Sequence, residues 1–122
     1  MSRAIEQASF LLNACNLIQA ATDMGFLVTA GELWRSPEQQ AIYVKTRRSK
    51  TMRSRHLERM AIDLNFFRDG QLVYGIEALA PLGDFWESLH PLNSWGGRGV
   101  SIKDVPHFSR GDGKPEFRRM ID

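Results

Sequence analysis

This chain of 122 residues has one cysteine, no long apolar run and only a mild excess of positive charge. No apolar stretch approaches the roughly 20 residues needed to span a bilayer. The N-terminus also lacks a basic region followed by an apolar block and a cleavage site. We therefore expect a soluble protein that is made in the cytoplasm and does not insert into membranes. Cys15 excludes an internal disulfide and a cysteine-based metal site, and its apolar helical surroundings predict that it is buried.

Basic and acidic side chains nearly balance, at 16 against 14. The exception is the segment 45–55, which could bind an anionic cell-envelope polymer or a nucleic acid, or could simply be a solvated loop. The chain has no recognisable zinc-finger, RNA-recognition or other strong nucleic-acid motif, so we expect no nucleic-acid partner. The basic residues of this segment are Lys45, Arg47, Arg48, Lys50, Arg53 and Arg55.

The length suits one core but hardly two. We predict one domain over residues 1–122, with its core in 3–110 and a loose tail from Gly111, and we expect a monomer. Apolar residues at helical spacing predict a first helix over 3–24, which Gly25 ends as a C-terminal cap. A short buried strand is expected over 26–33.

The remaining elements follow from caps, turns and alternation. Ser36 as N-cap, Pro37 in the first turn and Gln39 as capping-box residue predict a second helix over 37–45. Asp69-Gly70 is a strong hairpin signal. This turn separates two predicted strands, at 60–67 and 71–74. A third helix is expected at 76–90. It is followed by a strand at 93–95, a flexible turn at 96–99 and a last strand at 105–109. The fold class is therefore a small α+β domain, with helices packed on a mainly antiparallel sheet.

Two histidines and two carboxylates form a pattern that suits a catalytic metal. His56 in a loop and Asp63 on a strand are seven positions apart, so both could reach one ion, and His107 could be the third ligand. Zinc held by two imidazoles and a carboxylate keeps its fourth position for water and lowers the pKa of that water to roughly 7. Asp104 would lie beside this water as a general base. The pattern points to metal-assisted hydrolysis.

Other polar residues have simpler interpretations. A lone histidine near an apolar strand is usually a structural hydrogen-bonding residue, and only the combination with carboxylates favours a metal site. His90 lies at the end of a predicted helix, where a favourable charge at the C-terminus explains it. Glu58 lies two residues from His56, but the helical His-Glu-x-x-His motif is absent, so we interpret Glu58 as a solvated loop residue.

The metal-site residues resemble a known family. The pattern Ser-x-His-x6-Asp, followed by Asp-x-x-His-Phe, is similar to the motifs of the D-alanyl-D-alanine carboxypeptidase and L-alanyl-D-glutamate endopeptidase family of zinc peptidases. The short bacteriophage endolysins of this family, whose metal-site architecture is shared with lysostaphin-type enzymes and the N-terminal hedgehog domain, are the nearest likeness. The resemblance covers about residues 25–110. The residues that carry it are Ser54, His56, Asp63, Asp104, His107 and Phe108.

The resemblance implies roles for these residues. His56, Asp63 and His107 would bind one zinc ion, and Asp104 would pass a proton from the attacking water to the leaving amine. Arg35, before the second helix, resembles the family's arginine. It would contact the substrate or the oxyanion, unless it is a surface residue in a structural salt bridge.

Further residues would contact the substrate by the same resemblance. Gln39 and Ser54 are candidate substrate-binding residues. Trp95, which begins a Trp-Gly-Gly stretch, would shape the floor of the cleft. This tryptophan could equally be a core aromatic, because large rings contribute much burial.

The resemblance implies hydrolysis of a stem-peptide bond of bacterial peptidoglycan, namely the bond between L-alanine and D-glutamate. The enzyme would stay in the host cytoplasm until released and would act on the cell wall in the periplasm. Two features depart from the pattern: Arg59 stands where many relatives have glycine, and Asp104 stands where many carboxypeptidases have glutamate. The alternatives are a D-alanyl-D-alanine carboxypeptidase and a non-catalytic zinc or cell-wall-binding module.

Overall fold

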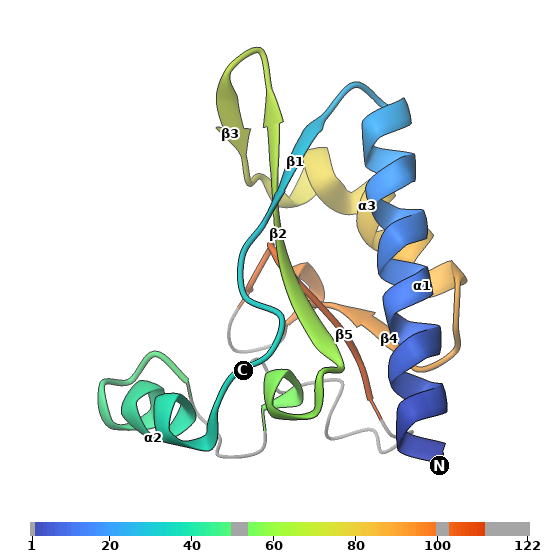
Figure 1. Ribbon diagram of the computed structural model, residues 1–122. Coiled ribbons are helices and arrows are strands. Elements are labelled where there is room, and N and C mark those ends of the chain that lie inside the picture. The colour runs from blue at the N-terminus through green and yellow to red at the C-terminus, as the bar shows by residue number, and fades with distance from the viewer. Residues whose placement is uncertain (1, 50–53, 100–102, 112–122) are drawn as a thin grey trace.

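The computed structural model describes residues 2–49, 54–99 and 103–111. Within these ranges, three α-helices and two short 3-10 helices accompany five strands (Figure 1). In chain order the elements are α1 (Ser2–Asp23), β1 (Leu27–Ala30), α2 (Pro37–Lys45), a 3-10 helix (Arg55–Glu58), β2 (Ala61–Arg68), β3 (Gln71–Val73), α3 (Ile76–Ser88), β4 (Asn93–Trp95), a second 3-10 helix (Gly96–Arg98) and β5 (His107–Arg110).

The predicted helix caps are confirmed. Gly25 has a φ of 93°, which glycine adopts easily, and the N–H of Phe26 bonds back to the carbonyl of Ala21 at 3.0 Å. Ser36 accepts a bond from the N–H of Gln39 at 3.0 Å, and α2 has the predicted bounds. The third helix ends at Ser88, two residues earlier than predicted.

The strands form one antiparallel sheet in the order β1-β2-β5-β4, and β3 pairs with β2 as well. The hairpin between β2 and β3 turns at Asp69 and Gly70, whose φ angles of 53° and 76° are those of a tight turn between twisted strands. β2 is the longest strand and the central one. It therefore connects the two halves of the sheet.

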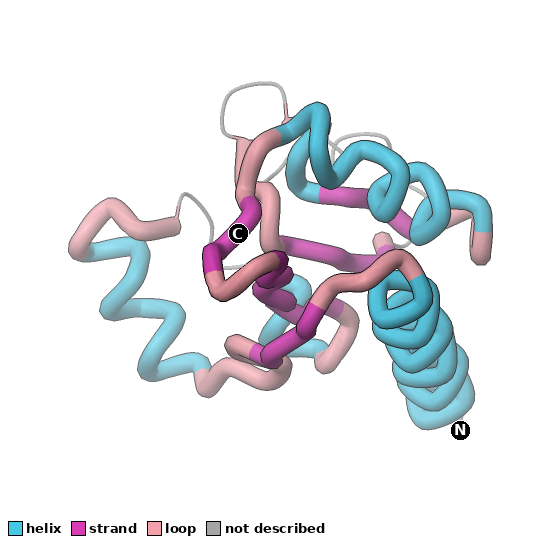
Figure 2. Tube along the Cα trace, turned by 90° about the horizontal axis from the view of Figure 1, so that it is seen from above, coloured by secondary structure: helices cyan, strands magenta, loops and turns pink. Residues whose placement is uncertain are grey.

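One face of the sheet carries the core. Ile62, Leu64 and Phe66 alternate along β2 and pack against apolar side chains of α1 and α3. Figure 2 shows α1 and α2 on opposite sides of the strands. The α+β fold predicted from the sequence is confirmed. The buried apolar residues from the helices include Phe10, Ala14, Leu17 and Ala21 of α1 and Leu79, Leu82 and Trp86 of α3.

The buried Arg110 joins α1 to the sheet. Its side chain is fully covered and donates to Asn93 at 2.9 Å, to Ser9 at 2.9 Å and to Asn13 at 2.7 Å. Because a buried guanidinium is costly unless it is hydrogen-bonded, these partners from β4 and α1 fix the position of the first helix. In the described part of the chain, no helix has the length and apolar character needed to cross a membrane.

Three predictions, about one residue and two segments, were wrong. Cys15 is exposed, because α1 turns Ala14 and Leu17 toward the sheet instead. β1 is not buried: Leu27 is 73% exposed, since α1 and α3 cover only the opposite face of the sheet. Residues 96–98 form a 3-10 helix rather than a flexible turn. The predicted tail after Gly111, and Lys50 and Arg53 of the basic segment, lie outside the described residues.

Candidate metal centre

β2 and β5 bring Asp63 and His107 together. The two residues are register partners. The backbone N–H of Asp63 donates to the carbonyl of Glu32, and its carbonyl accepts from the N–H of Gly31, so both point away from β5. Asp63 and His107 therefore form a pair without backbone hydrogen bonds between them. In an antiparallel sheet, the side chains of such a pair lie closest together. The Nδ1 of His107 is 3.5 Å from Oδ1 of Asp63.

His56 reaches the same point from a short 3-10 helix rather than from the predicted loop. Ser54 caps this helix and accepts a bond from the N–H of His56 at 3.1 Å. The ring nitrogen Nδ1 of His56 lies 3.0 Å from the carbonyl of Leu33. This contact turns Nε2 toward Asp63, 3.5 Å from Oδ1. A histidine held through one ring nitrogen by a backbone carbonyl is the usual arrangement of a metal ligand.

The three side chains form a buried cluster. His56 and His107 are 1% and 2% exposed, and the candidate ligand atoms of the cluster all lie within 4.8 Å of one another. Burial alone would raise the pKa of Asp63, but the side chains of His107 and His56 hold that pKa well below its usual range. Asp63 is therefore a carboxylate at neutral pH.

The cluster fits a divalent ion. Among the described residues, Oδ1 of Asp63 is buried and makes no hydrogen bond of normal geometry. Four-coordinate zinc at about 2.1 Å from its ligands sets those ligands about 3.4 Å apart, close to the 3.5 Å between Asp63 and each imidazole. Two imidazoles and one carboxylate are also the donor types of catalytic zinc sites. His56, Asp63 and His107 could therefore hold one metal ion.

Asp104 lies beside this cluster and is not one of its members. The carbonyl of Asp104 accepts from the N–H of His107 at 3.1 Å, and its N–H donates to the carbonyl of Gly96 at 2.9 Å. A Cβ at Gly96 would collide with the carbonyl of Asp104 and lie 2.9 Å from Cβ of His107. The backbone around Gly96 thus fixes the turn that carries both Asp104 and His107.

Arg35 is buried under the turn that carries His56. Its guanidinium pairs with Glu32, donates to Gln40 at 2.7 Å and donates to Ser54 at 3.2 Å. Its backbone N–H donates to the carbonyl of His56 at 3.2 Å. The side chain is only 5% exposed. The structural salt bridge considered from the sequence is present, and Arg35 holds Ser54 and His56 in place.

The buried amide beside Arg35 belongs to Gln40 and not to Gln39. Gln40 is fully buried and bonds to both Arg35 and Ser49, at 2.7 and 2.8 Å. Gln39 is half-buried, and its backbone N–H serves the helix cap. Sequence reasoning missed Gln40, Glu32 and the carbonyl of Leu33. The spacing of Glu32 and Arg35 by three residues was the available signal for their ion pair.

The remaining predicted substrate contacts are covered by protein. Ser54 is 1% exposed and uses its hydroxyl to accept from Arg35 and from His56. Trp95 is also 1% exposed, and its indole N–H donates to the carbonyl of Val105 at 2.8 Å. A Cβ at Gly83 or Gly97 would overlap this indole ring, so the two glycines make room for it. Trp95 is therefore a core residue, and it bonds to the backbone of Val105, next to Asp104.

Three neighbours of the cluster have structural explanations. Glu58 pairs with Arg55 at 2.8 Å, within the 3-10 helix rather than in a loop, and is not part of the cluster. Arg59 ends this helix with a φ of 58°, which explains why glycine suits this position in the related motif. His90 accepts a bond at Nδ1 from the N–H of Leu92 at 3.0 Å. Burial and Arg110 lower its pKa, which disfavours the predicted positive charge at the helix end.

Comparison with known proteins supports this fold. No protein-family model matches the sequence, and no curated protein matches it either. Among solved structures, the chain is similar to the L-Ala D-Glu endopeptidase ChiX of Serratia marcescens, with a TM-score of 0.65 and 24% sequence identity. The match covers 84% of this chain and 79% of that chain. At this level of identity the likeness shows a shared fold.

Proposed function

We propose that this protein is a zinc-dependent peptidase that cleaves the stem peptides of bacterial peptidoglycan, at the bond between L-alanine and D-glutamate. The carrying observation is the buried cluster of His56, Asp63 and His107, whose ligand atoms converge and whose carboxylate oxygen has no hydrogen bond among the described residues. The fold shared with an L-Ala D-Glu endopeptidase supports the choice of substrate.

His56, Asp63 and His107 would hold the zinc ion. When bound, the ion would polarise the scissile carbonyl and lower the pKa of a water molecule. Burial of the two imidazoles keeps these side chains in one geometry, and the contact of His56 with the carbonyl of Leu33 aims Nε2 inward. Preorganised ligands of this kind lose little entropy on binding the ion.

Asp104 is the proposed acid and base. It is half-buried in the turn that precedes His107, and its carbonyl bonds to the N–H of that histidine. Its carboxylate would accept a proton from the attacking water and return it to the leaving amine. Arg35 is proposed as a positioning residue, because its guanidinium is committed to Glu32, Gln40 and Ser54.

The test is mass spectrometry of purified peptidoglycan after incubation with the protein, with zinc present and after chelation. The proposal expects new L-alanine C-termini and D-glutamate N-termini that disappear on chelation. Asp104→Ala should abolish this cleavage and keep zinc binding, whereas His90→Ala, which removes a histidine outside the cluster, should keep both. Released free D-alanine would replace the proposal with a carboxypeptidase. Zinc binding without any product from several wall types would indicate a wall-binding module.

Such an enzyme would remain in the host cytoplasm until released and would then act in the periplasm, as a bacteriophage endolysin does. This proposal is tested by following lysis of cells that express the protein with and without a separate membrane pore. Lysis should require the pore and an intact Asp104. Lysis without a pore would contradict the release step and leave the peptidase assignment in place.

A further inference from the structure

One edge of β2 is shared by two strands that do not meet. β5 pairs with β2 through Asp63, and β3 begins to pair with it at Phe66. β1 occupies the opposite edge over residues 64–67 of β2. Residues 64 and 65 therefore line a notch in the sheet, between the start of β5 and the end of β3. The notch begins directly beside Asp63 and His107.

Among the described residues, no loop or turn N–H is found to donate to the carbonyl of Leu64, at the edge of the notch. The N–H of Leu64 points into the notch and donates to the carbonyl of Pro106 at 2.9 Å. In an antiparallel ladder, the carbonyl of Leu64 points to the same side as its N–H. Pro106 has no N–H to return a bond. An extended peptide lying in the notch could donate an N–H to this carbonyl, as an added strand does at a sheet edge.

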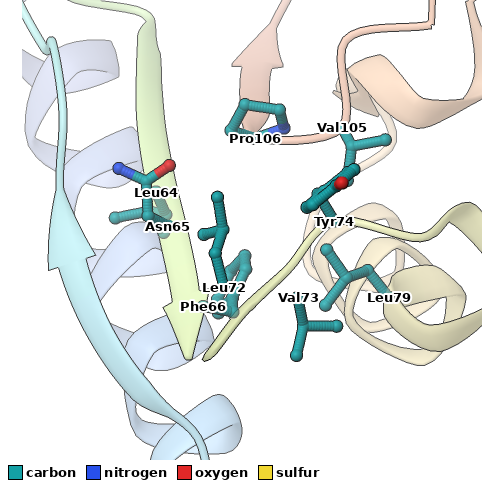
Figure 3. Close-up of a pocket in the computed structure, with 9 residues that line it drawn as sticks. All are labelled: Leu64, Asn65, Phe66, Leu72, Val73, Tyr74, Leu79, Val105 and Pro106. Atoms are coloured by element: carbon teal, nitrogen blue, oxygen red, sulfur yellow. The ribbon is translucent and has the colours of Figure 1, made fainter. Parts of the chain in front are cut away.

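A small apolar recess lies in this notch (Figure 3). Its volume is about 70 Å³. A closed cavity of about 150 Å³ holds benzene, so this smaller recess suits a methyl group or a slightly larger aliphatic group. Leu72 and Tyr74, at its edge, are 45% and 69% exposed. The lining residues are Leu64, Asn65, Phe66, Leu72, Val73, Tyr74, Leu79, Val105 and Pro106.

Asn65 is the amide at the rim of this recess. It lies two residues from Asp63 on β2, so both side chains are on the same face of the sheet. Figure 3 shows Asn65 on the side of the recess opposite Tyr74. In the described part of the chain no hydrogen bond to the Asn65 carboxamide is found, and the side chain is half-buried. The amide can therefore donate to, and accept from, the backbone of a bound peptide.

We infer that the notch is the binding subsite for the residue on the acyl side of the cleaved bond, and that its recess selects a small apolar side chain such as alanine. This inference rests on the proposed peptidase function. Asn65 and the carbonyl of Leu64 bind the peptide backbone, and Leu72 and Tyr74 limit the size of the side chain. The position beside Asp63 and His107 places that residue next to the reacting bond.

The inference is tested with synthetic stem peptides that carry glycine, alanine or leucine on the acyl side. Wild-type protein with zinc should cleave the leucine peptide with a kcat/KM at least about tenfold below that of the alanine peptide. Leu72→Ala and Tyr74→Ala widen the recess. Each should raise the ratio of kcat/KM for the leucine peptide to kcat/KM for the alanine peptide by roughly tenfold. Asn65→Leu should raise KM about fivefold for every peptide, with kcat and zinc affinity unchanged.

Leu27→Ala is the matched control, since it removes an exposed apolar side chain that does not line the recess. It should leave the ratio and KM unchanged. Cleavage by the wild type with a ratio that neither Leu72→Ala nor Tyr74→Ala alters would overturn the subsite and leave the peptidase standing. An unchanged KM in Asn65→Leu would remove Asn65 from it. No cleavage of any peptide or of peptidoglycan would reject the proposed function and the subsite together.

Discussion

His107 is the register partner of Asp63, and its Nδ1 lies 3.5 Å from the carboxylate Oδ1. The pairing of β5 with β2 therefore sets this distance, so two candidate ligands come from rigid neighbouring strands. His56 approaches from a 3-10 helix that Arg35 and Ser54 hold in place. The site thus depends on both the sheet and a buried polar network.

The first prediction concerns metal binding by the cluster. Wild-type protein should bind one zinc ion per chain, because three ligand atoms converge on one point. His56→Ala and His107→Ala each remove one of these ligands and should weaken zinc binding on the order of 100-fold or more. Competition with a coloured chelator measures these affinities. His90→Ala is the control and should bind zinc like the wild type; equal weakening in all three variants would contradict the site.

The second prediction separates two neighbouring glutamines. Gln40→Leu removes the acceptor that Arg35 uses and a bond to Ser49, so it should lower the free energy of unfolding by about 1–3 kcal/mol. Gln39→Leu changes a half-buried side chain and should lower the free energy of unfolding by about 0.5 kcal/mol or less. Urea unfolding monitored by circular dichroism gives both values. A larger loss in Gln39→Leu would contradict the buried network.

The third prediction concerns the backbone at Arg59. Its φ of 58° and ψ of 34° are left-handed, a conformation that costs a residue with a side chain about 1–2 kcal/mol. Both Arg59→Gly and Arg59→Ala lose the contact of Arg59 with the Trp34 ring. The glycine variant should therefore exceed the alanine variant in unfolding free energy by about 1 kcal/mol.

The control for Arg59 is an exposed position inside α1. Gln19 has ordinary helical surroundings, so Gln19→Gly should be less stable than Gln19→Ala by about 1 kcal/mol. Thermal and urea unfolding of the four variants test this difference. Glycine should be the more stable variant at position 59 and alanine the more stable one at position 19. The same order at both positions would show that the left-handed backbone at Arg59 carries no cost.

The fourth prediction concerns pH. The pKa of His90 is lowered by burial and by Arg110, and its Nδ1 accepts a bond from Leu92 that protonation would remove. The folded protein therefore binds this proton less readily than the unfolded chain, so the contribution of His90 to stability is full above about pH 6.5. It should be lost as the pH falls through the lowered pKa.

The measurement compares unfolding free energies of wild type and His90→Ala between pH 8 and pH 5. The difference between the two proteins should shrink on acidification, since the alanine variant cannot titrate at this position. Subtracting the variant cancels the contributions of all other groups, which both proteins contain. A difference that grows on acidification would show that protonated His90 is the form that stabilises the fold.

Most element boundaries could be predicted because their signals are local. Gly25, Ser36 with Pro37, and Asp69 with Gly70 act through the φ angles and hydrogen bonds of their own backbone, which require no distant contact. The strand alternation also identified β2. The predicted site residues His56, Asp63 and His107 came together as expected, although their role as zinc ligands stays a prediction.

The sequence by itself determined the helices, the hairpin and the residue types of the cluster, because caps, turns and periodicity are properties of neighbouring residues. Only the tertiary structure decided which faces are covered. Leu27 is exposed because α1 and α3 pack on the other face of the sheet, and Cys15 is exposed because α1 turns Ala14 and Leu17 inward. Gln40 rather than Gln39 contacts Arg35 because Gln40 lies on the buried side of α2. The notch beside Asp63 likewise exists only because β3 and β5 share one edge of β2. Burial and such gaps depend on where distant segments lie, which no local pattern specifies.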